Sequence, residues 1–264
     1  MSTETILPID RNTIETGSQA AAEPEWMTRL RLRGLELAGS LELPRLEKTR
    51  IDRWNLDSFG SYKSAQPITS IDELPETAAK LLKPEGETLS ECLIVQRNSN
   101  VVYSQLSEEV KKQGVVFASL QEALKTHGDI ISNHFMQVIK ADEHKLTALH
   151  SAMWSGGIFL YVPKNVQVEV PLQALFLTDD AEASLSPHIL VIAEANSSVT
   201  YVDNFTSAGT GGPLVQNGIV EVVVKSGAKV NFASVHHFGE QVTDLTFRRA
   251  LWRTTGRSTG LSAK

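Results

Sequence analysis

The second half of the chain repeats one short pattern of alternating apolar and polar positions. The pattern occupies residues 165–170, 197–202 and 227–232. Val168, Val199 and Val230 take equivalent places in the three copies, at intervals of 31 residues. Alternation puts the valines and aromatic side chains on one face of a β-strand and the polar side chains on the other. A β-type recurrence of this length predicts the stacked coils of a solenoid, while a β-sandwich with evenly spaced hairpins remains the alternative.

The beginning of the chain has no such alternation. Residues 1–23 are polar and non-periodic, which predicts a mobile N-terminal arm. Residues 24–38 begin with a proline and can place Trp26, Leu30 and Leu37 on one face of a helix. We therefore expect the ordered part of the protein to begin with this helix.

Two further signals indicate strands and helices upstream of the repeats. Residues 92–103 contain two apolar runs joined by Asn-Ser-Asn, which predicts a β-hairpin. Ser119 and Glu122 stand three positions apart before an apolar run, as in a capping box at the start of a helix. Together with the first helix, these signals predict an N-terminal α/β region over residues 24–155.

The pattern changes at Gly156 and Gly157. From there to about residue 250 only strands and turns are indicated, so we expect a mainly β protein whose incomplete β-helix core spans residues 156–250. Residues 251–264 lose the alternation and gain small and basic side chains. We expect this segment to be an atypical tail that arises from a shifted reading frame or an artificial terminus.

Composition and charge exclude several classes of protein. The 264 residues carry a formal net charge of −6, which argues against a nucleic-acid-binding surface, since that requires a clustered basic face. No apolar run reaches the length of a membrane span, and the start lacks the features of a signal peptide. The single Cys92 excludes an intramolecular disulfide framework. A cytoplasmic protein is the expectation.

The adjacent pair His236 and His237 provides the only candidate metal ligands, and weak ones. Neighbouring side chains in a strand point to opposite faces, so the two imidazoles do not readily share one ion. His144 and His150 stand six positions apart, whereas ligands on one helix face favour a spacing of four. We therefore expect packing or capping roles for both pairs of histidines, and no metal site.

The remaining candidate residues favour structural roles. Cys92 begins an apolar run without a basic neighbour, which predicts a buried structural thiol. Asp179 and Asp180 lie in a polar segment between two strands, where a solvated turn is expected rather than a pair of catalytic carboxylates. The glycine-rich segment that begins at Gly209 has no following lysine, so it is not a phosphate loop. The sequence contains no convincing active site, and we expect no catalytic activity.

Residues 144–172 carry a recognisable order of motifs. A Leu- and Ala-rich helix precedes Gly-Ile-Phe-Leu-Tyr-Val-Pro-Lys, a Val-Gln-Val-Glu-Val strand and Pro-Leu. With residues 187–202, this order resembles the SufB/SufD family of iron–sulfur cluster assembly proteins. The segment 43–54, with its proline and terminal tryptophan, is similar to the SufD branch of that family. The resemblance covers about residues 25–250.

The resemblance implies a right-handed parallel β-helix that acts as a scaffold and not as an enzyme. It implies a complex with a SufB-like subunit and a SufC-like ATPase, in which an iron–sulfur cluster and a reduced flavin are held. Family members continue beyond residue 264 through further coils and the helices that dock SufC. No functional residue is therefore carried over to this chain, and the isolated chain is expected to hold no cofactor.

An incomplete β-helix leaves an apolar face and unpaired strand edges at its end. We therefore expect self-association through that end. Two other functions remain open from the sequence, a β-helix carbohydrate-active enzyme and a purely structural interaction module. The first is usually secreted and has clustered Asp, Lys or Arg side chains, and the sequence shows neither feature.

Overall fold

The chain folds into short helices followed by a long run of strands. The computed structural model describes residues 7–54, 56, 58–83 and 88–253. The α-helices are α1 (Arg11–Ala20), α2 (Glu25–Ser40), α3 (Glu76–Leu82), α4 (Glu108–Lys112), α5 (Leu120–Thr126), α6 (Gly128–Ser132) and α7 (Lys145–Met153), with 3₁₀ turns at Ile51–Arg53 and Ile71–Glu73. The strands are β1 (Leu93–Arg97), β2 (Asn100–Gln105), β3 (Val116–Ser119), β4 (Gly157–Val162), β5 (Leu172–Thr178), β6 (His188–Ala193), β7 (Ser198–Ser207), β8 (Leu214–Gln216), β9 (Ile219–Val224), β10 (Lys229–His237), β11 (Val242–Asp244) and β12 (Phe247–Trp252).

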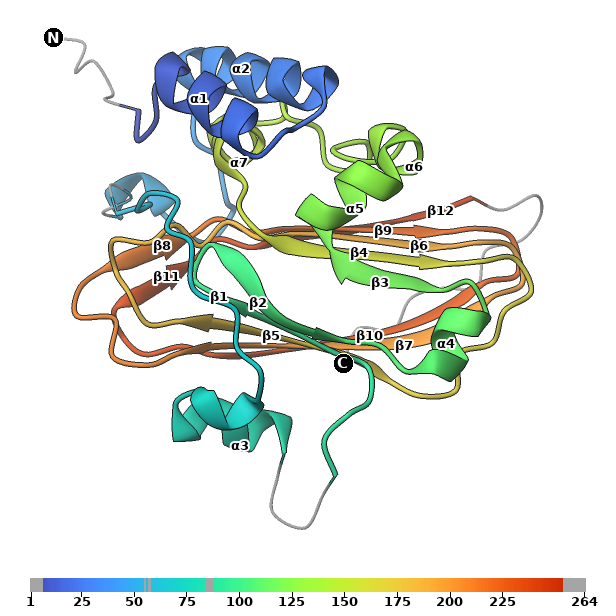
Figure 1. The fold of residues 1–264 in the computed structure, drawn as a ribbon. Helices are drawn as coiled ribbons and strands as arrows, with labels where there is room; N and C mark the ends of the chain where they lie inside the picture. Colours follow the sequence, from blue (N-terminus) through green and yellow to red (C-terminus); the bar gives the residue numbers. More distant parts are fainter. Residues whose placement is uncertain (1–6, 55, 57, 84–87, 254–264) are drawn as a thin grey trace, which may run out of the picture.

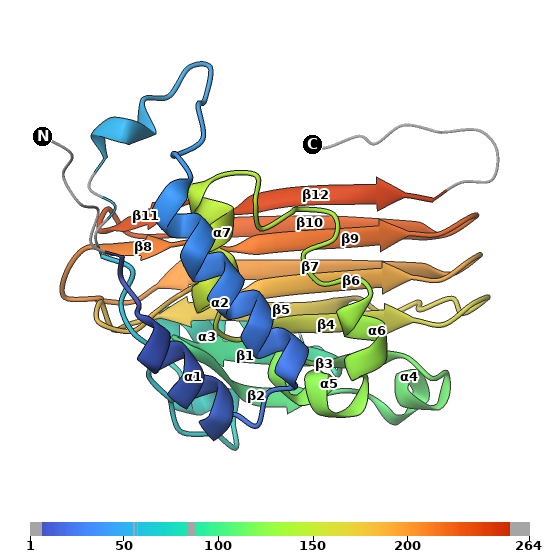
Figure 2. The ribbon, with the colours of Figure 1, turned by 90° about the horizontal axis from the view of Figure 1, so that it is seen from above.

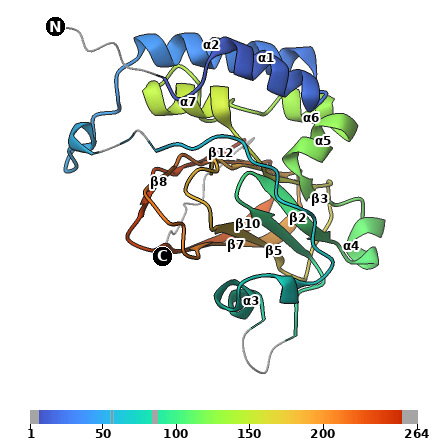
Figure 3. The same ribbon diagram turned by 60° about the vertical axis from the view of Figure 1, so that its left-hand side comes forward.

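Two five-stranded sheets face each other across the centre of the molecule. Their strand orders are β12-β9-β6-β4-β3 and β10-β7-β5-β1-β2, and β11 and β8 form a small third sheet at one side. Helices α1, α2 and α5 to α7 lie over the first sheet, while α3 lies on the outer side of the second (Figure 1). Figure 3 shows the same layers from another side.

Successive coils wind through both sheets. The chain passes from β4 to β5, then from β6 through β7 and β8, and then from β9 through β10 and β11 to β12. Strands of successive coils pair in parallel in all three sheets. Seen from above, the strands lie side by side as a regular stack (Figure 2). The parallel β-helix predicted from the sequence is confirmed, and the β-sandwich alternative is excluded.

The repeat read from the sequence is the register of this stack. Val199 pairs with Val230, and Gln167 pairs with Ser198, so both pairs join residues 31 positions apart. On the other sheet, Gly157 pairs with His188 at the same spacing. Each valine of the pattern therefore lies above its equivalent in the preceding coil, where the apolar faces of the coils are buried against each other.

An apolar interior, here called the lumen, lies between the two large sheets. It is filled by aliphatic side chains of both sheets, such as Val191 and Leu172, which are fully buried. An aromatic column crosses the coils, with ring centroids 4.4 Å apart between Phe176 and Phe205 and 4.5 Å apart between Phe205 and His236. Stacked rings of this kind add to the stabilisation that comes from area burial.

The N-terminal region closes one end of the β-helix. Strand β1 pairs in parallel with β5, and β2 and β3 add antiparallel strands to the two sheets. The predicted hairpin is thus confirmed and serves as a cap on the first coil. Residues 58–68, called the strap, continue this cover. The amide of Ser61 donates to the carbonyl oxygen of Glu182 at 2.8 Å, and the amide of Ile68 donates to the carbonyl oxygen of Val102 at 2.9 Å.

Within the segment 1–23, for which the sequence predicts a mobile arm, residues 11–20 form the helix α1. The carboxylate of Asp10 caps this helix and accepts a hydrogen bond from the amide of Thr13 at 2.7 Å. Ile14 is buried in a cluster that also contains Ala38 and Leu149. Ser18 is also buried, and its hydroxyl donates to Glu23 at 2.9 Å. Two buried positions in ten residues are too few to give a helical period. Residues 1–6 lie outside the described part of the chain.

The strand pattern continues slightly further than expected at the other end. Leu251 and Trp252, which we assigned to an atypical tail, belong to β12 and pair with Val223 and Val224 of β9. The rest of that predicted tail, from residue 254 onward, lies outside the described residues. The all-β segment therefore runs from Gly157 to Trp252.

The close approach of α2 and α7 depends on one glycine. A Cβ at Gly34 would lie 2.8 Å from the carbonyl oxygen of Ala148 and from the amide nitrogen of Ala152, whereas a Cβ at Gly39 of the same helix would meet nothing within 4 Å. We predict that Gly34→Ala lowers the free energy of unfolding by roughly 1–3 kcal/mol, because the two helices must separate. Gly39→Ala is the control and should raise it by about 0.5–1 kcal/mol. Urea denaturation of the two variants measures both effects, and equal stability of the two would contradict the prediction.

Candidate functional site

The β-helix has an exposed edge formed by β10, β11 and β12. Each of these strands pairs with a strand of the preceding coil on one side, and within the described residues none pairs on the other. They are the outermost strands of the stack (Figure 2). Val235, Leu251 and Trp252 on these strands are 51%, 37% and 43% exposed, which is unusual for large apolar side chains. Unpaired backbone groups beside exposed apolar side chains are the features of a surface that accepts another strand.

A set of polar side chains points into the lumen beside this edge. It consists of Asp203 of β7, Ser234 and His236 of β10, Asp244 of β11 and Arg248 of β12, and we call it the lumen cluster. His236 Nδ1 lies 2.6 Å from Asp244 Oδ2, and His236 Nε2 lies 3.0 Å from Ser234 Oγ. Asp203 accepts a hydrogen bond from the Ser234 hydroxyl, and Arg248 donates to Ser234 Oγ at 3.2 Å.

The order serine, histidine, aspartate invites comparison with a hydrolytic triad, but the proton positions differ. A triad needs the serine proton to face the histidine base. Here the Ser234 hydroxyl donates to Asp203, and the guanidinium of Arg248 contacts His236 Nε2, the atom that would take the proton. The cluster is therefore arranged as a closed polar network and not as an activated nucleophile.

Burial of Asp203 is the main electrostatic feature of the lumen cluster. Burial raises the pKa of Asp203 to about 6, although the Ser234 hydroxyl and the charge of Arg248 act in the opposite direction. Its Oδ2 has no hydrogen-bond partner among the described residues. Burial also acts on Asp244, but hydrogen bonds from His236 and Thr246 outweigh it and hold the pKa of Asp244 below its ordinary value. The two carboxylates of one cluster are thus shifted in opposite directions.

Sequence reasoning missed this cluster, although one signal was present. Asp203 and Ser234 are 31 residues apart, the spacing of the repeat, so they face the same way in successive coils. Applying the 31-residue offset to polar residues, as well as to valines, would have paired them.

The structure places the two candidate metal ligands on opposite faces of β10. His236 points into the lumen, while His237 points outward and is exposed. The two imidazoles therefore do not approach a common ion. Among the described residues, no group of three or more His, Cys, Asp or Glu side chains is arranged to hold a metal ion.

The other singled-out residues of the N-terminal region have structural positions. His144 caps α7, where its Nδ1 accepts from the amide of Thr147 at 3.2 Å. Cys92 is fully buried and its Sγ lies 3.7 Å from Ser107 Oγ. His150 is fully buried between α7 and the β-helix. In the part of the chain that is described, no helix is both long and apolar enough to cross a membrane.

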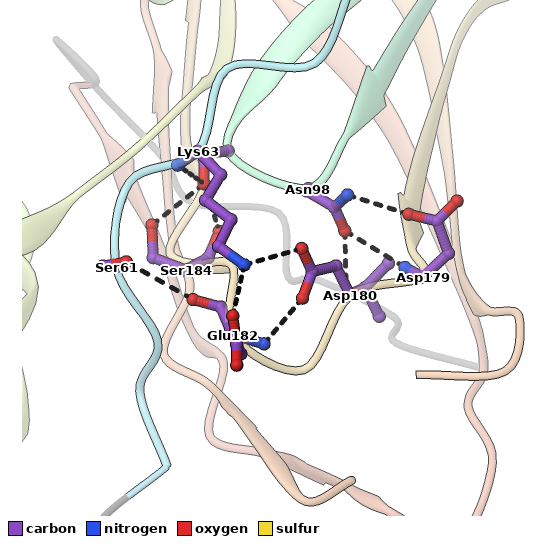
Figure 4. A network of polar contacts seen from close by, with 9 residues as sticks. Ser61, Lys63, Asn98, Asp179, Asp180, Glu182 and Ser184 are labelled. Carbon is purple, nitrogen blue, oxygen red and sulfur yellow. Dashed lines mark hydrogen bonds and ion pairs between the residues drawn. The ribbon is translucent and has the colours of Figure 1, made fainter. Parts of the chain in front are cut away.

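The turn with Asp179 and Asp180 is not the simply solvated turn that the sequence suggested. Asp179 is held by Asn98 Nδ2 at 2.8 Å and by the guanidinium of Arg97 at 2.6 Å. Asp180 Oδ2 lies 2.9 Å from Lys63 Nζ of the strap (Figure 4). The two carboxylates therefore attach the strap and the β1–β2 hairpin to the first coil. The polar composition of the segment was visible in the sequence, but its partners lie more than 80 residues away.

Two models of known protein families match consecutive parts of the chain. A family model described as "SufBD protein N-terminal region" matches residues 23–174, and one described as "SUF system FeS cluster assembly, SufBD core domain" matches residues 176–263. The chain belongs to the SufBD family. The first match spans more than half of the chain and the second contains most of the parallel coils.

Individual relatives agree with this assignment. The chain is 38% identical over 255 residues to the iron–sulfur cluster assembly protein SufD of Bacillus subtilis, which covers 96% of this chain and 58% of the relative. It is 32% identical over 250 residues to SufB of the same organism, covering 92% and 54%, and 34% identical over 251 residues to a SufBD family protein of Pyrococcus horikoshii, covering 92% and 56%. The chain thus spans slightly more than half the length of these relatives, and it is more similar to the SufD than to the SufB of B. subtilis.

The opposite pKa shifts of the two lumen carboxylates lead to opposite mutational effects. Because the pKa of Asp203 is raised in the folded state, its charged form destabilises the fold as pH rises from about 4 through 6. We predict that Asp203→Asn stabilises the protein at pH 8 by up to about 3 kcal/mol and by less at pH 5. Asp244→Asn is the control: the pKa of Asp244 is lowered, so this variant should lose stability at pH 8. Urea denaturation at both pH values tests this, and a uniform loss in Asp203→Asn would contradict it.

Proposed function

We propose that this chain is a scaffold subunit of the Suf system for iron–sulfur cluster assembly, acting in the cytosol. Support comes from the two family matches, which together follow almost the whole chain from residue 23 to residue 263. The greater identity to a SufD than to a SufB favours the SufD role within the system. A scaffold positions partners and cargo, which fits a lumen whose polar cluster holds no activated nucleophile.

The proposed partners are a SufB-like subunit and a SufC-like ATPase. The similarity of the chain to a SufD and a SufB, both iron–sulfur cluster assembly proteins, supports this proposal. The iron–sulfur cluster is the cargo of the complex, and a reduced flavin would be held there as well. Cluster binding generally requires several thiolate ligands, and this chain has one cysteine, so the complex must supply the others.

The family membership favours this function over the two others left open by the sequence. A β-helix carbohydrate-active enzyme needs carboxylates placed around a bound sugar, at separations that leave room for water or a nucleophile. Asp179 and Asp180 are each paired with cations of the N-terminal region, and Asp203 is buried in the lumen. A purely structural module would lack the Suf partners, which makes partner binding the deciding observation.

A pull-down tests the proposed partnership. We predict that the tagged chain retains a co-expressed SufB-like subunit, and that full-length B. subtilis SufD, run in parallel with its own partners, retains both SufB and SufC. The comparison matters because it separates a failed assay from a failed proposal. Retention of neither partner by this chain, with both retained by the relative, would contradict the proposed function.

We also propose that the chain alone self-associates through the exposed edge. Lysine on an edge strand disfavours strand addition, so Val235→Lys should weaken self-association by about tenfold. Val170→Lys is the matched control, because Val170 is similarly exposed, at 47% against 51% for Val235, and lies outside the three edge strands. Sedimentation velocity over a range of concentrations measures the effect. A chain that stays monomeric at all concentrations, or an equal effect of both variants, would rule out this mode of association.

A further inference from the structure

Three ionisable side chains are fully buried between the helical layer and the β-helix. His150 comes from α7, His188 from β6 and Glu221 from β9, and each has no exposed surface. His188 and Glu221 point outward from their sheet, toward the helices that cover it. Charged groups are seldom buried unless they are paired and hydrogen-bonded, so the contacts of this trio define its role.

The carboxylate of Glu221 holds the segment that follows α6. Glu221 Oε2 accepts from the amide of Met136 at 2.6 Å, and Oε1 accepts from the amides of Val138 at 2.6 Å and Ile139 at 2.9 Å. Met136 has a positive φ of 54°, which turns these amides toward one point. Three amide donors favour a charged acceptor, so the segment 136–139 is attached to β9 through one carboxylate.

The two histidines extend this contact to α7. His150 Nδ1 donates to the carbonyl oxygen of Asn217 at 2.7 Å, so its Nε2 is left as the acceptor for His188 Nδ1, 3.0 Å away. His188 Nε2 then lies 3.1 Å from Glu221 Oε2. His188 thus lies between the acceptor nitrogen of His150 and the Glu221 carboxylate. Asn217 completes the attachment, since its Nδ2 donates to the carbonyl oxygen of Leu146 at 2.9 Å.

Charged side chains from the neighbouring elements also face this trio. Arg31 of α2 acts on His150 from one side and is itself paired with Glu23 at 2.7 Å. Arg249 of β12 donates to the carbonyl oxygen of Val138 at 2.8 Å and pairs with Glu143 at 2.6 Å. Phe135 covers His188, with ring centroids 3.9 Å apart. Each arginine is paired with a carboxylate outside the trio. The charge balance within the trio is therefore set by His150, His188 and Glu221 themselves.

We propose that His150, His188 and Glu221 form a proton-operated latch that lets the segment 136–139 and α7 separate from the β-helix while the coils stay intact. In the closed state, His150 must offer a lone pair to His188. A proton on His150 removes that acceptor and brings two N–H donors face to face at 3.0 Å in a buried site. The hydrogen bond that joins α7 to β6 is then lost, while the hydrogen bonds between coils do not involve these side chains.

The direction of the pH dependence follows from His150. Burial first, and the charge of His188 second, hold the pKa of His150 well below its ordinary 6.5. The released state binds this proton more readily than the closed state. The latch therefore contributes its full stability at pH values above the ordinary pKa of histidine and loses it as the pH falls below that value. Asp203 acts in the opposite direction, because its protonation favours the folded lumen. Acid should therefore loosen the helical layer before it opens the coils.

The protein contains a native reporter for each part. Trp154 follows α7, is 1% exposed and packs in the cluster with Phe135 and Met27, so its fluorescence reports on the helical layer. Cys92, the only thiol of the chain, is fully buried at the start of β1 and reports on the first coil through its reactivity. A disulfide reagent that reacts in acid, dithiodipyridine, can be used over the same pH range. A Trp154→Phe variant identifies the contribution of this tryptophan to the emission.

The experiment is an acid titration of the full chain from about pH 7.5 to 4, with both reporters. We expect the Trp154 emission to shift to the red while Cys92 stays protected. Glu221→Gln weakens the latch and should move this transition up by about one pH unit or more, and His150→Gln removes the titrating group and should move it down. His237→Gln is the control, because His237 is exposed on the outer face of β10.

Two results would overturn the latch. Cys92 could become reactive at the same pH at which the Trp154 emission shifts, which would mean that the whole protein unfolds at once. Alternatively, the transition could stay at the wild-type pH in Glu221→Gln. If His150→Gln does not fold, the Glu221→Gln comparison alone decides the question, since that variant keeps the size of the side chain while it removes the charge and replaces one acceptor oxygen with an amide donor.

Discussion

Parallel hydrogen bonding between successive coils is the interaction on which the rest of this structure depends. A strand of the β-helix has no hairpin partner, so its amides and carbonyls are satisfied only by the coil before it and the coil after it. The N-terminal region supplies the missing neighbours of the first coil through β1, β2, β3 and the strap. At the other side, β10, β11 and β12 have no further strand neighbour within the described residues. The chain itself thus covers the first coil.

Buried charge is distributed unevenly over this framework. Glu221 accepts three amide hydrogen bonds and faces His188, so its negative charge is balanced and fixes the helical layer to the sheet. Asp203 has a hydroxyl partner for one oxygen and none for the other, and its pKa is raised accordingly. The first carboxylate stabilises an internal contact, while the second is tolerated at some expense of stability beside the exposed edge. Such incompletely satisfied groups are typical of positions where function, not folding, selects the residue.

The sequence predicted the parts of this fold that follow a local period. The valines at intervals of 31 residues gave the coil stack and its register, and Gly156 with Gly157 marked where the helices stop. Helix α1 was missed because it buries only Ile14 and Ser18, too few positions to give a helical period. The trio of His150, His188 and Glu221 was missed for a different reason. Its members are 38 and 33 residues apart along the chain, and only the stacking of β6 on β9 under α7 brings them together. The family was recognisable from motifs that cover a whole segment, whereas the polar clusters needed the three-dimensional register.

The exposed edge and the buried latch are joined through one side chain. Arg249 lies on the edge strand β12, yet its guanidinium binds the carbonyl of Val138, whose own amide is held by Glu221. A partner strand added to β12 would fix the backbone that carries Arg249, and this would favour the closed position of the segment 136–139. Conversely, release of that segment would remove one of the two contacts of Arg249 and leave its pairing with Glu143. By reciprocity, any partner that binds β12 more tightly in the closed state must also strengthen the latch by the same free energy. The helical layer is therefore more than a cover for one sheet, because its attachment and the position of Arg249 on β12 depend on the same contacts.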